Sequence, residues 1–372
     1  MTSPTSLRTI TAAEHEAFIS TQPSASFLQV PAWAEVKAEW GAESVGWFHG
    51  DQIIGAGLVL YRQLPKIKRS LAYLPEGPVI DWEAADLAAW LDPMVAHLRK
   101  RGAFGIRIGP PTVLHTWSAA QVKEGVADPA CALLSQLPPT GGNPEGKRIL
   151  ANLRASGWRV QGVEGGFAAG QPQFNFVIPL RGRSEDDVLA GMNQLWRRNI
   201  KKAAKAGVEV SQGTIEDLTA FHGLYVETAA RDHFTPRPLS YFTTMFEALN
   251  NGGPSELRVY LAHHEGDLVA STIWIRVGEH VWYSYGASST AKRDVRGSNA
   301  IQWRMITDAI EAGASVYDLR GITETLDPDD PHVGLIQFKV GTGGEAVEYP
   351  GEWDLPLNRP LYKAFELYMR RR

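Results

Sequence analysis

Positive charge is concentrated in one short segment, residues 193–205, which reads NQLWRRNIKKAAK and holds five cations and no anion. Four of these cations recur at spacings of three and four residues, so on a helix they share one face: Arg198, Lys201, Lys202 and Lys205. Leu195, Ile200 and Ala203 are expected on the inward side. Such a row can follow the phosphates of RNA or of an anionic membrane. A solvated helix face has the same pattern, and composition cannot separate these interpretations.

A second candidate for phosphate binding is Arg237, in the segment RDHFTPRPLSYF. Pro236 and Pro238 restrict the backbone on both sides and suit a side chain held at a fixed angle. A guanidinium can grip a phosphate through two parallel hydrogen bonds, which a lysine cannot do. The alternative is a loop arginine that caps a helix or pairs with Asp232.

Lys37 lies in PAWAEVKAEWG, a predicted helix whose apolar face holds Trp33, Val36 and Trp40. Its position four residues after Trp33 puts the ammonium at the edge of that face, directed inward. A surface lysine that lays its stem along apolar neighbours would look the same.

Two further segments combine polar or aromatic groups with a fixed spacing. Tyr283 and Tyr285, in YSYGASS, are two residues apart and are expected on one face of a strand. In QFKVGTGG, Phe338 and Lys339 precede three glycines that allow close approach of the backbone. An ordinary half-buried strand and a glycine-rich hairpin with a solvated lysine are the alternatives.

The elements that must position these residues occur twice along the chain. WFHGDQIIGAGLVL is matched by LAHHEGDLVASTIWI, each with Gly-Asp between apolar strands. A later helix in each copy stops at a glycine before a strand, at Gly102 and at Gly313. Two α/β modules that face each other would form a cleft for two large substrates, which predicts a transfer between them. The stretch from Val113 to Gly170 is rich in Gly and Pro, and we expect a long, mobile excursion around a helix at Lys147–Ser156.

Composition is that of an ordinary enzyme-sized protein. The 372 residues are 44% hydrophobic, enough for two cores. The single cysteine, Cys131, excludes an intramolecular disulfide framework and a cysteine zinc cluster. No signal peptide or membrane-spanning run is recognised, which predicts a cytoplasmic protein with at most peripheral contact at the inner face of the membrane. The net charge of −4 gives no overall attraction to nucleic acid.

Several of these segments, together with LPKIKRSLAYLPEGPVID and EYPGEWDLPLN, resemble the Fem (FemABX) family of peptidoglycan bridge-forming aminoacyltransferases. The resemblance runs from about Phe27 to the C-terminus and is weakest at 113–170. It implies an α/β (α+β) fold of two GNAT-like domains in tandem, each a mixed, mostly antiparallel sheet flanked by helices. We expect domain 1 at 1–180, completed by 351–372, and domain 2 at 181–350.

The resemblance also implies the reaction. A glycine, alanine or serine would move from aminoacyl-tRNA to the side-chain amine of the diamino acid in UDP-MurNAc-pentapeptide or lipid II, without cofactor or metal. Lys37, Arg237, Tyr241, Tyr283 and Tyr285 would then bind the precursor. Lys339 would hold the ester or stabilise the oxyanion, and Phe338 would position it. The cations of 193–205 are the first candidates for tRNA contact, because no long helical arm fits between Val210 and Phe221. We expect a monomer.

A general base is harder to place. The acceptor amine, with a reference pKa of about 10.4, must lose a proton before it attacks. Many relatives carry Asp-Pro where this chain has Gly109-Pro110. Asp318, in YDLRG of the second copy, is the nearest remaining candidate and is followed by Arg320, where relatives often have Gly.

Three rivals remain open. An acyl-CoA-dependent GNAT enzyme would need a glycine-rich pyrophosphate loop, and KRDVRGSNA fits that pattern poorly. A transferase from tRNA to protein N-termini would differ only in its acceptor. A non-catalytic RNA- or membrane-binding module would use the basic helix alone.

Overall fold

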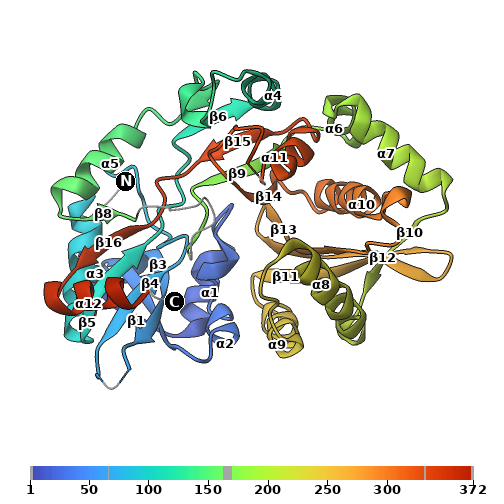
Figure 1. The fold of residues 1–372 in the computed structure, drawn as a ribbon. Helices are drawn as coiled ribbons and strands as arrows, with labels where there is room; N and C mark the ends of the chain where they lie inside the picture. Colours follow the sequence, from blue (N-terminus) through green and yellow to red (C-terminus); the bar gives the residue numbers. More distant parts are fainter. Residues whose placement is uncertain (1–2, 66, 162–169, 331, 370–372) are drawn as a thin grey trace. The chain divides into compact units, whose positions relative to one another are not determined.

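The computed structural model describes residues 3–65, 67–161, 170–330 and 332–369, in two compact units (Figure 1). Unit 1 comprises Met1–Thr116, Gly141–Gln173 and Glu348–Arg372, and unit 2 comprises Trp117–Thr140 and Phe174–Val347. Each unit is built on its own mixed sheet.

Unit 1 has a sheet in the order β1-β2-β3-β4-β5-β16-β8. Its elements are β1 Ser6–Ile10, α1 Ala12–Ser20, α2 Trp33–Val36, β2 Gly41–His49, β3 Gln52–Gln63, β4 Ser70–Leu74, α3 Ala88–Lys100, β5 Ala103–Ile108, β7 Gly141–Gly142, α5 Gly146–Ala155, β8 Arg159–Val160, β16 Trp353–Pro356 and α12 Arg359–Met369. β6 (His115–Ser118) pairs with β7. The C-terminal segment belongs to this unit, since β16 lies between β5 and β8.

Unit 2 holds seven strands of a nine-stranded sheet, in the order β10-β11-β12-β13-β14-β9-β15. Its elements are α4 Ala119–Ala127, β9 Phe174–Pro179, α6 Glu185–Gly191, α7 Gln194–Lys205, β10 Glu209–Gly213, α8 Leu218–Asp232, α9 Leu239–Leu249, β11 Ser255–His264, β12 Asp267–Val277, β13 His280–Ser288, α10 Gly297–Glu311, β14 Val316–Ile322, α11 Val333–Val340 and β15 Glu345–Glu348. Figure 1 shows α7 and α10 on one side of β11–β13, with α8 and α9 on the other.

The predicted repeat is present in both sheets. A hairpin and a third strand (β2-β3-β4, and β11-β12-β13) are followed by a long helix and a strand that pairs parallel to the third one. The helix is α3 in unit 1 and α10 in unit 2. The glycines after these helices have positive φ, 87° at Gly102 and 73° at Gly313, which terminates the helix and reverses the chain.

One expectation about chain order was wrong. The first domain, expected at 1–180, included FNFVIPL (Phe174–Leu180) as its closing strand, but the strand found there, β9, pairs antiparallel with β14 of unit 2. The described part of the excursion expected at 113–170 contains β6, α4, β7, α5 and β8. The helix predicted at Lys147–Ser156 is found at Gly146–Ala155, and α4 packs against α11 in unit 2. Most of the glycine-rich run GVEGGFAAGQPQ lies outside the described residues.

Between Val210 and Phe221 there is no long helical arm, as expected; the chain passes from β10 through a short 3-10 helix at Ile215–Asp217 to α8. Among the residues that the structure describes, no helix is both long and apolar enough to cross a membrane.

Between β5 and β16, a buried ion cluster ties the C-terminal segment to unit 1. Arg107 donates two hydrogen bonds to Asp354, both of 2.8 Å, and its Nη1 lies 3.6 Å from Glu352 Oε2. Tyr73 donates to Glu352 at 2.5 Å, and Tyr362 donates to Asp354. Burial raises the pKa of Glu352, although the Arg107 charge opposes this. A single guanidinium is therefore shared by two buried carboxylates.

Replacing Arg107 with Met is expected to lower the free energy of unfolding by about 3–5 kcal/mol, because two carboxylates lose their cation in a buried site. Urea unfolding of the full chain, followed by tryptophan fluorescence, measures this loss. Arg99→Met on the exposed surface of α3 is the control. Equal unfolding midpoints for the two variants would show that the cluster contributes nothing.

Candidate functional site

Lys339 lies in the last turn of α11 and is only 3% exposed, so it is not a solvated lysine. Its Nζ donates to the main-chain carbonyls of Arg320, at 3.1 Å, and Gly321, at 2.6 Å. Burial lowers the pKa of Lys339 to about 7, an effect that the Asp318 charge partly opposes. A buried amine that titrates near neutral pH is typical of functional sites.

Asp318 is buried on β14, beside the carbonyls that Lys339 binds. Its carboxylate accepts hydrogen bonds from Asn175 Nδ2 at 3.1 Å and from the Arg320 main-chain N–H at 2.5 Å. His280 Nε2 lies 3.5 Å from it. Burial raises the pKa of Asp318, but the nearby His280 imidazole and the Arg320 charge outweigh this effect, so the pKa lies below its usual range. The carboxylate is therefore held ionised.

Arg320 sits between these two buried charges in a strained conformation. Its φ is +63°, a value that costs a non-glycine residue free energy. Asp318 accepts from its N–H and Lys339 donates to its carbonyl, so opposite charges clamp both of its peptide groups. The ladder between β14 and β9 is interrupted between Asp318 and Gly321. Strain of this kind, held by surrounding structure, is concentrated at functional sites.

Phe338 precedes Lys339 and packs against Trp196 of α7, with ring centroids 4.8 Å apart. The glycines that follow serve contacts inside the protein rather than an open hairpin. An added Cβ at Gly341 would lie 2.2 Å from Trp196 Cδ1, and one at Gly344 would lie 2.1 Å from the Val177 carbonyl oxygen. The glycine-rich stretch is thus a packing junction at the end of α11.

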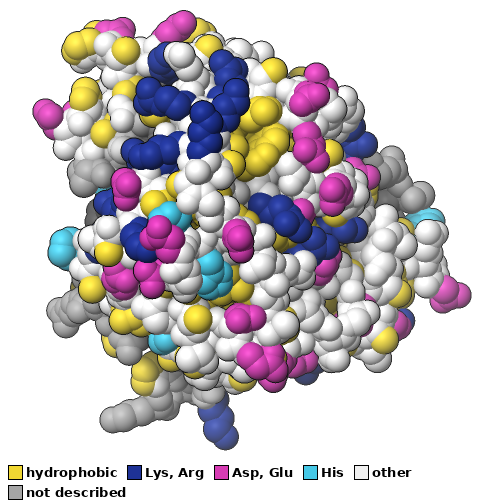
Figure 2. Space-filling model, turned by 90° about the vertical axis from the view of Figure 1, so that its right-hand side faces the viewer, with side chains coloured by type: hydrophobic (Ala, Val, Ile, Leu, Met, Phe, Trp, Pro, Cys, Tyr) yellow, Lys and Arg dark blue, Asp and Glu magenta, His cyan; other side chains and the backbone are white. Residues whose placement is uncertain are grey.

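The basic face of α7 is present as predicted. Arg198, Lys201, Lys202 and Lys205 are all exposed. Figure 2 shows Lys and Arg side chains gathered in the upper part of this side of the molecule, next to hydrophobic atoms. The predicted inward face was partly wrong, because Leu195 is 50% exposed and Trp196 takes its place in the core. A tryptophan buries more apolar surface than leucine, and the Asn193 side chain caps the helix so that Trp196 points inward.

Arg237 lies in the exposed loop before α9, and its guanidinium carbon is 5.1 Å from the centre of the Tyr241 ring. The hydroxyl of Tyr241 is 3.1 Å from that of Tyr285. The pairing of Arg237 with Asp232 is not the one found, since Asp232 pairs with Arg231 at 2.8 Å. An arginine stacked beside two phenol hydroxyls offers both charge and hydrogen bonds to an anionic group.

Tyr283 and Tyr285 do not share a strand face. Tyr285 has a φ of +50°, and the β12–β13 register shifts between Ser271 and Ile273, so a bulge breaks the alternation. Tyr283 packs on the hydrophobic core of unit 2, where burial raises its pKa to about 12. Tyr285 instead meets Phe242 and Tyr241 of α9. Of the two, the geometry groups only Tyr285 with Arg237.

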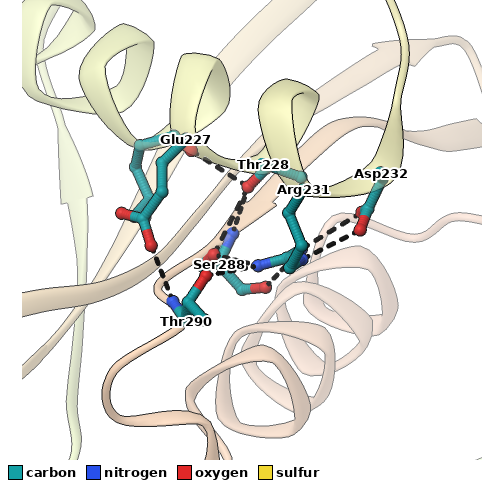
Figure 3. A network of polar contacts seen from close by, with 7 residues as sticks. Glu227, Thr228, Arg231, Asp232, Ser288 and Thr290 are labelled. Carbon is teal, nitrogen blue, oxygen red and sulfur yellow. Dashed lines mark hydrogen bonds and ion pairs between the residues drawn. The ribbon is translucent and has the colours of Figure 1, made fainter.

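A polar network just after this bulge fixes α8 to the end of β13 (Figure 3). Arg231 Nη1 donates to the Ser288 carbonyl at 2.8 Å, and Thr228 Oγ1 accepts from the Ser288 N–H at 3.0 Å. The Thr290 N–H donates to Glu227 at 2.8 Å. These bonds anchor β13 three residues beyond Tyr285 and so support its unusual backbone.

Lys37 lies in unit 1 and caps a helix shorter than expected, since α2 ends at Val36. The Lys37 side chain is 17% exposed; its Nζ lies 3.8 Å from Glu39 and 5.9 Å from the centre of the Trp40 ring. Arg62 approaches the same ring at 5.6 Å. Two cations thus flank one indole, an arrangement suited to a phosphate.

Sequence reasoning missed three residues of these sites. Arg62 is too far along the chain from Lys37 to be linked to it by residue spacing. No motif in the sequence links His280 to Asp318. Trp196 could have been found, because it occupies the position opposite the basic row on the same helix.

The full sequence matches the FemAB family model over residues 10–259 and 255–370. The chain belongs to the FemAB family. It is 25% identical to the lipid II:glycine glycyltransferase of Staphylococcus aureus (strain MRSA252), over 96% of this chain and 94% of that protein. The crystal structure of FemX superposes with a TM-score of 0.81 at 24% identity, covering 97% of this chain and 99% of that one. A tandem GNAT protein from the clavulanic acid biosynthesis pathway gives 0.53 at 11% identity, covering 94% and 98%.

These matches confirm two predictions for this FemAB-family chain. The fold is α/β, with two GNAT-like domains in tandem. The protein is an enzyme of the transferase class.

Proposed function

We propose that this protein transfers an amino acid from aminoacyl-tRNA to the side-chain amine of the diamino acid in a peptidoglycan precursor, extending the interpeptide bridge. The S. aureus relative is named for glycine and lipid II, so we propose glycine as the first donor amino acid and lipid II as the first acceptor. Alanine, serine and the soluble UDP-MurNAc-pentapeptide are the alternatives to be compared.

The observation that carries the proposal is a buried lysine on an element docked against an exposed basic helix. When an amine attacks an ester, negative charge develops on the carbonyl oxygen, and a preorganised cation stabilises it. Lys339 can supply this cation, and Phe338 can shape the space beside it. The exposed cations of α7 can bind the phosphates of the tRNA. Within unit 2, donor binding and ester chemistry would thus use neighbouring elements.

The remaining residues receive supporting roles in this proposal. Asp318 fixes the peptide around Arg320 and keeps the surroundings of Lys339 polar, rather than acting as the base. Arg237, Tyr241 and Tyr285 bind an anionic group of the precursor, and Lys37 with Arg62 binds a phosphate in unit 1. Tyr283, packed in the core, supports β13. No carboxylate is assigned as base, so the proton of the attacking amine would pass to the tRNA or to water.

A transfer assay tests the proposal. Glycine, alanine and serine, each radiolabelled on tRNA, are offered with lipid II and separately with UDP-MurNAc-pentapeptide. We expect label in lipid II with glycyl-tRNA. Label from acetyl-CoA, with none from any charged tRNA, would instead establish an acyl-CoA-dependent enzyme. Transfer to a peptide with a free N-terminus, and not to either precursor, would establish the protein N-terminal reaction.

A further inference from the structure

The N-terminus of α7 and the C-terminus of α11 are joined by direct contacts. Trp196 is 3% exposed, and its Nε1 donates to the Phe338 carbonyl at 2.8 Å. The Asn193 N–H donates to the Gly341 carbonyl at 3.0 Å. Carbonyls in the last turn of a helix have no partner within that helix, so these two donors from α7 satisfy groups that α11 cannot satisfy itself. We call these contacts the α7–α11 joint.

Gly341 is required in the joint because a side chain would not fit there, and not because of its backbone conformation. Its φ of −60° and ψ of −20° are helical values that any residue adopts. An added Cβ would nevertheless lie 2.2 Å from Trp196 Cδ1 and 2.5 Å from its Nε1. The indole therefore lies flush against the backbone two residues after Lys339, and neither element can shift without the other.

The joint connects two groups that serve different parts of one reaction. On the α7 side, four exposed cations form a row along the helix. On the α11 side, Lys339 is pinned by two hydrogen bonds to β14. A misplacement of about 1 Å at a reacting centre can cost roughly a hundredfold in rate, so the spacing between these groups matters.

We propose that Trp196 is a positioning residue, which with Gly341 holds the Phe338–Lys339 pair in register with the RNA-binding face of α7. An acylated RNA whose backbone lies along α7 is then aligned so that its 3′ ester reaches Lys339. This inference rests on the proposed aminoacyl-tRNA donor. It adds that the alignment is set inside unit 2, by the joint.

The first test uses a pair of glycines, one within α11 and one directly after it. Gly341→Ala places a Cβ against Trp196, whereas Gly334→Ala meets nothing within 4 Å. We expect Gly341→Ala to lower kcat for transfer by roughly ten- to a hundredfold, with the Kd for glycyl-tRNA unchanged within about twofold. Gly334→Ala should leave both values at the wild-type level.

A second pair of variants separates the effect of breaking the joint from the general effect of replacing a buried tryptophan. Trp196→Phe keeps a ring but removes the donor to Phe338. Trp274→Phe makes the same change in the core of unit 2, where the indole nitrogen has no hydrogen-bond partner within the described structure. Only Trp196→Phe should lower kcat. Trp196→Ala removes the ring with which the added Cβ of Gly341→Ala would clash, so the effects of these two substitutions on kcat should be strongly non-additive.

The outcomes distinguish failure of the positioning role of the joint from failure of the proposed aminoacyl-tRNA donor. If kcat is unchanged in Trp196→Phe and Gly341→Ala while wild-type protein transfers from tRNA, the joint has no positioning role. A weakened Kd with unchanged kcat would also overturn it, because Trp196 would then belong to the RNA surface. Failure of the wild-type protein to bind or use charged tRNA would overturn the proposed donor itself, and the inference with it.

Discussion

Replacing Lys339 with Met is expected to reduce kcat for amino-acid transfer by roughly a hundred- to a thousandfold, the usual cost of losing one group that stabilises an oxyanion. Methionine keeps the length and apolar stem of the side chain but removes the ammonium. The Kd values for charged tRNA and for lipid II should stay close to those of the wild type. Single-turnover transfer, with separate binding measurements, measures the three quantities.

Lys123→Met, on the exposed surface of α4, is the matched control, because it removes an exposed lysine of the same unit. Retention of more than about a third of the wild-type kcat in Lys339→Met would exclude an electrostatic role in the reaction. Transfer would then depend on groups other than the Lys339 ammonium.

The burial of Lys339 also predicts how the free energy of unfolding depends on pH. Its pKa is about 7 in the folded protein and about 10.4 in an unfolded chain, so between these values the unfolded state binds more protons. The free energy of unfolding should therefore rise with pH across this window, by up to about 1.4 kcal/mol per pH unit from this group. In Lys339→Met this component is lost. Parallel pH dependences of unfolding in the two proteins would show that the amine is not buried as described.

Neutralising the basic face of α7 should have the second large effect, on binding of tRNA. The variant changes Arg198, Lys201, Lys202 and Lys205 to Gln. Each lost phosphate contact should lower the slope of log Kd against log salt by about 0.7–0.9, so the four together should lower it by about 3. At low salt the affinity should fall by roughly a hundredfold or more. Filter binding of glycyl-tRNA over a range of salt concentrations measures both.

A charge-matched control changes four exposed cations elsewhere to Gln: Arg99, Lys100, Lys123 and Lys147. Both variants have the same net charge, so a difference between their tRNA affinities depends on where the replaced cations lie. Identical tRNA affinities would mean that α7 is an ordinary solvated helix face. Loss of binding to anionic phospholipid vesicles, with tRNA binding intact, would assign the face to a membrane instead.

Features governed by local sequence could be predicted well. The hairpin at Gly50-Asp51 and the helix ends at Gly102 and Gly313 depend on turn residues and on periodicity, which are visible in short windows. The repeated order of these signals was enough to predict two similar modules. The basic row of α7 was predicted because helical spacing alone determines it.

Features governed by distant neighbours could not be predicted. The bulge at Tyr285 separates it from Tyr283, and nothing in YSYGASS distinguishes it from a regular strand. Gly341 was expected to allow close approach of the backbone, but the sequence did not indicate that its neighbour is the Trp196 indole, which lies far away along the chain. In both places a tertiary contact overrode the local pattern.

The position of β16 also bears on how the protein is made. This strand occupies an interior place in the unit 1 sheet, between β5 and β8, yet it follows all of unit 2 along the chain. During synthesis from the N-terminus, β5 therefore emerges with an unpaired edge and must wait for its neighbour while unit 2 is translated. Exposed strand edges of this kind invite pairing with other chains. The nascent protein is thus vulnerable to aggregation while unit 2 is being translated, and chaperone demand should be greatest in that interval.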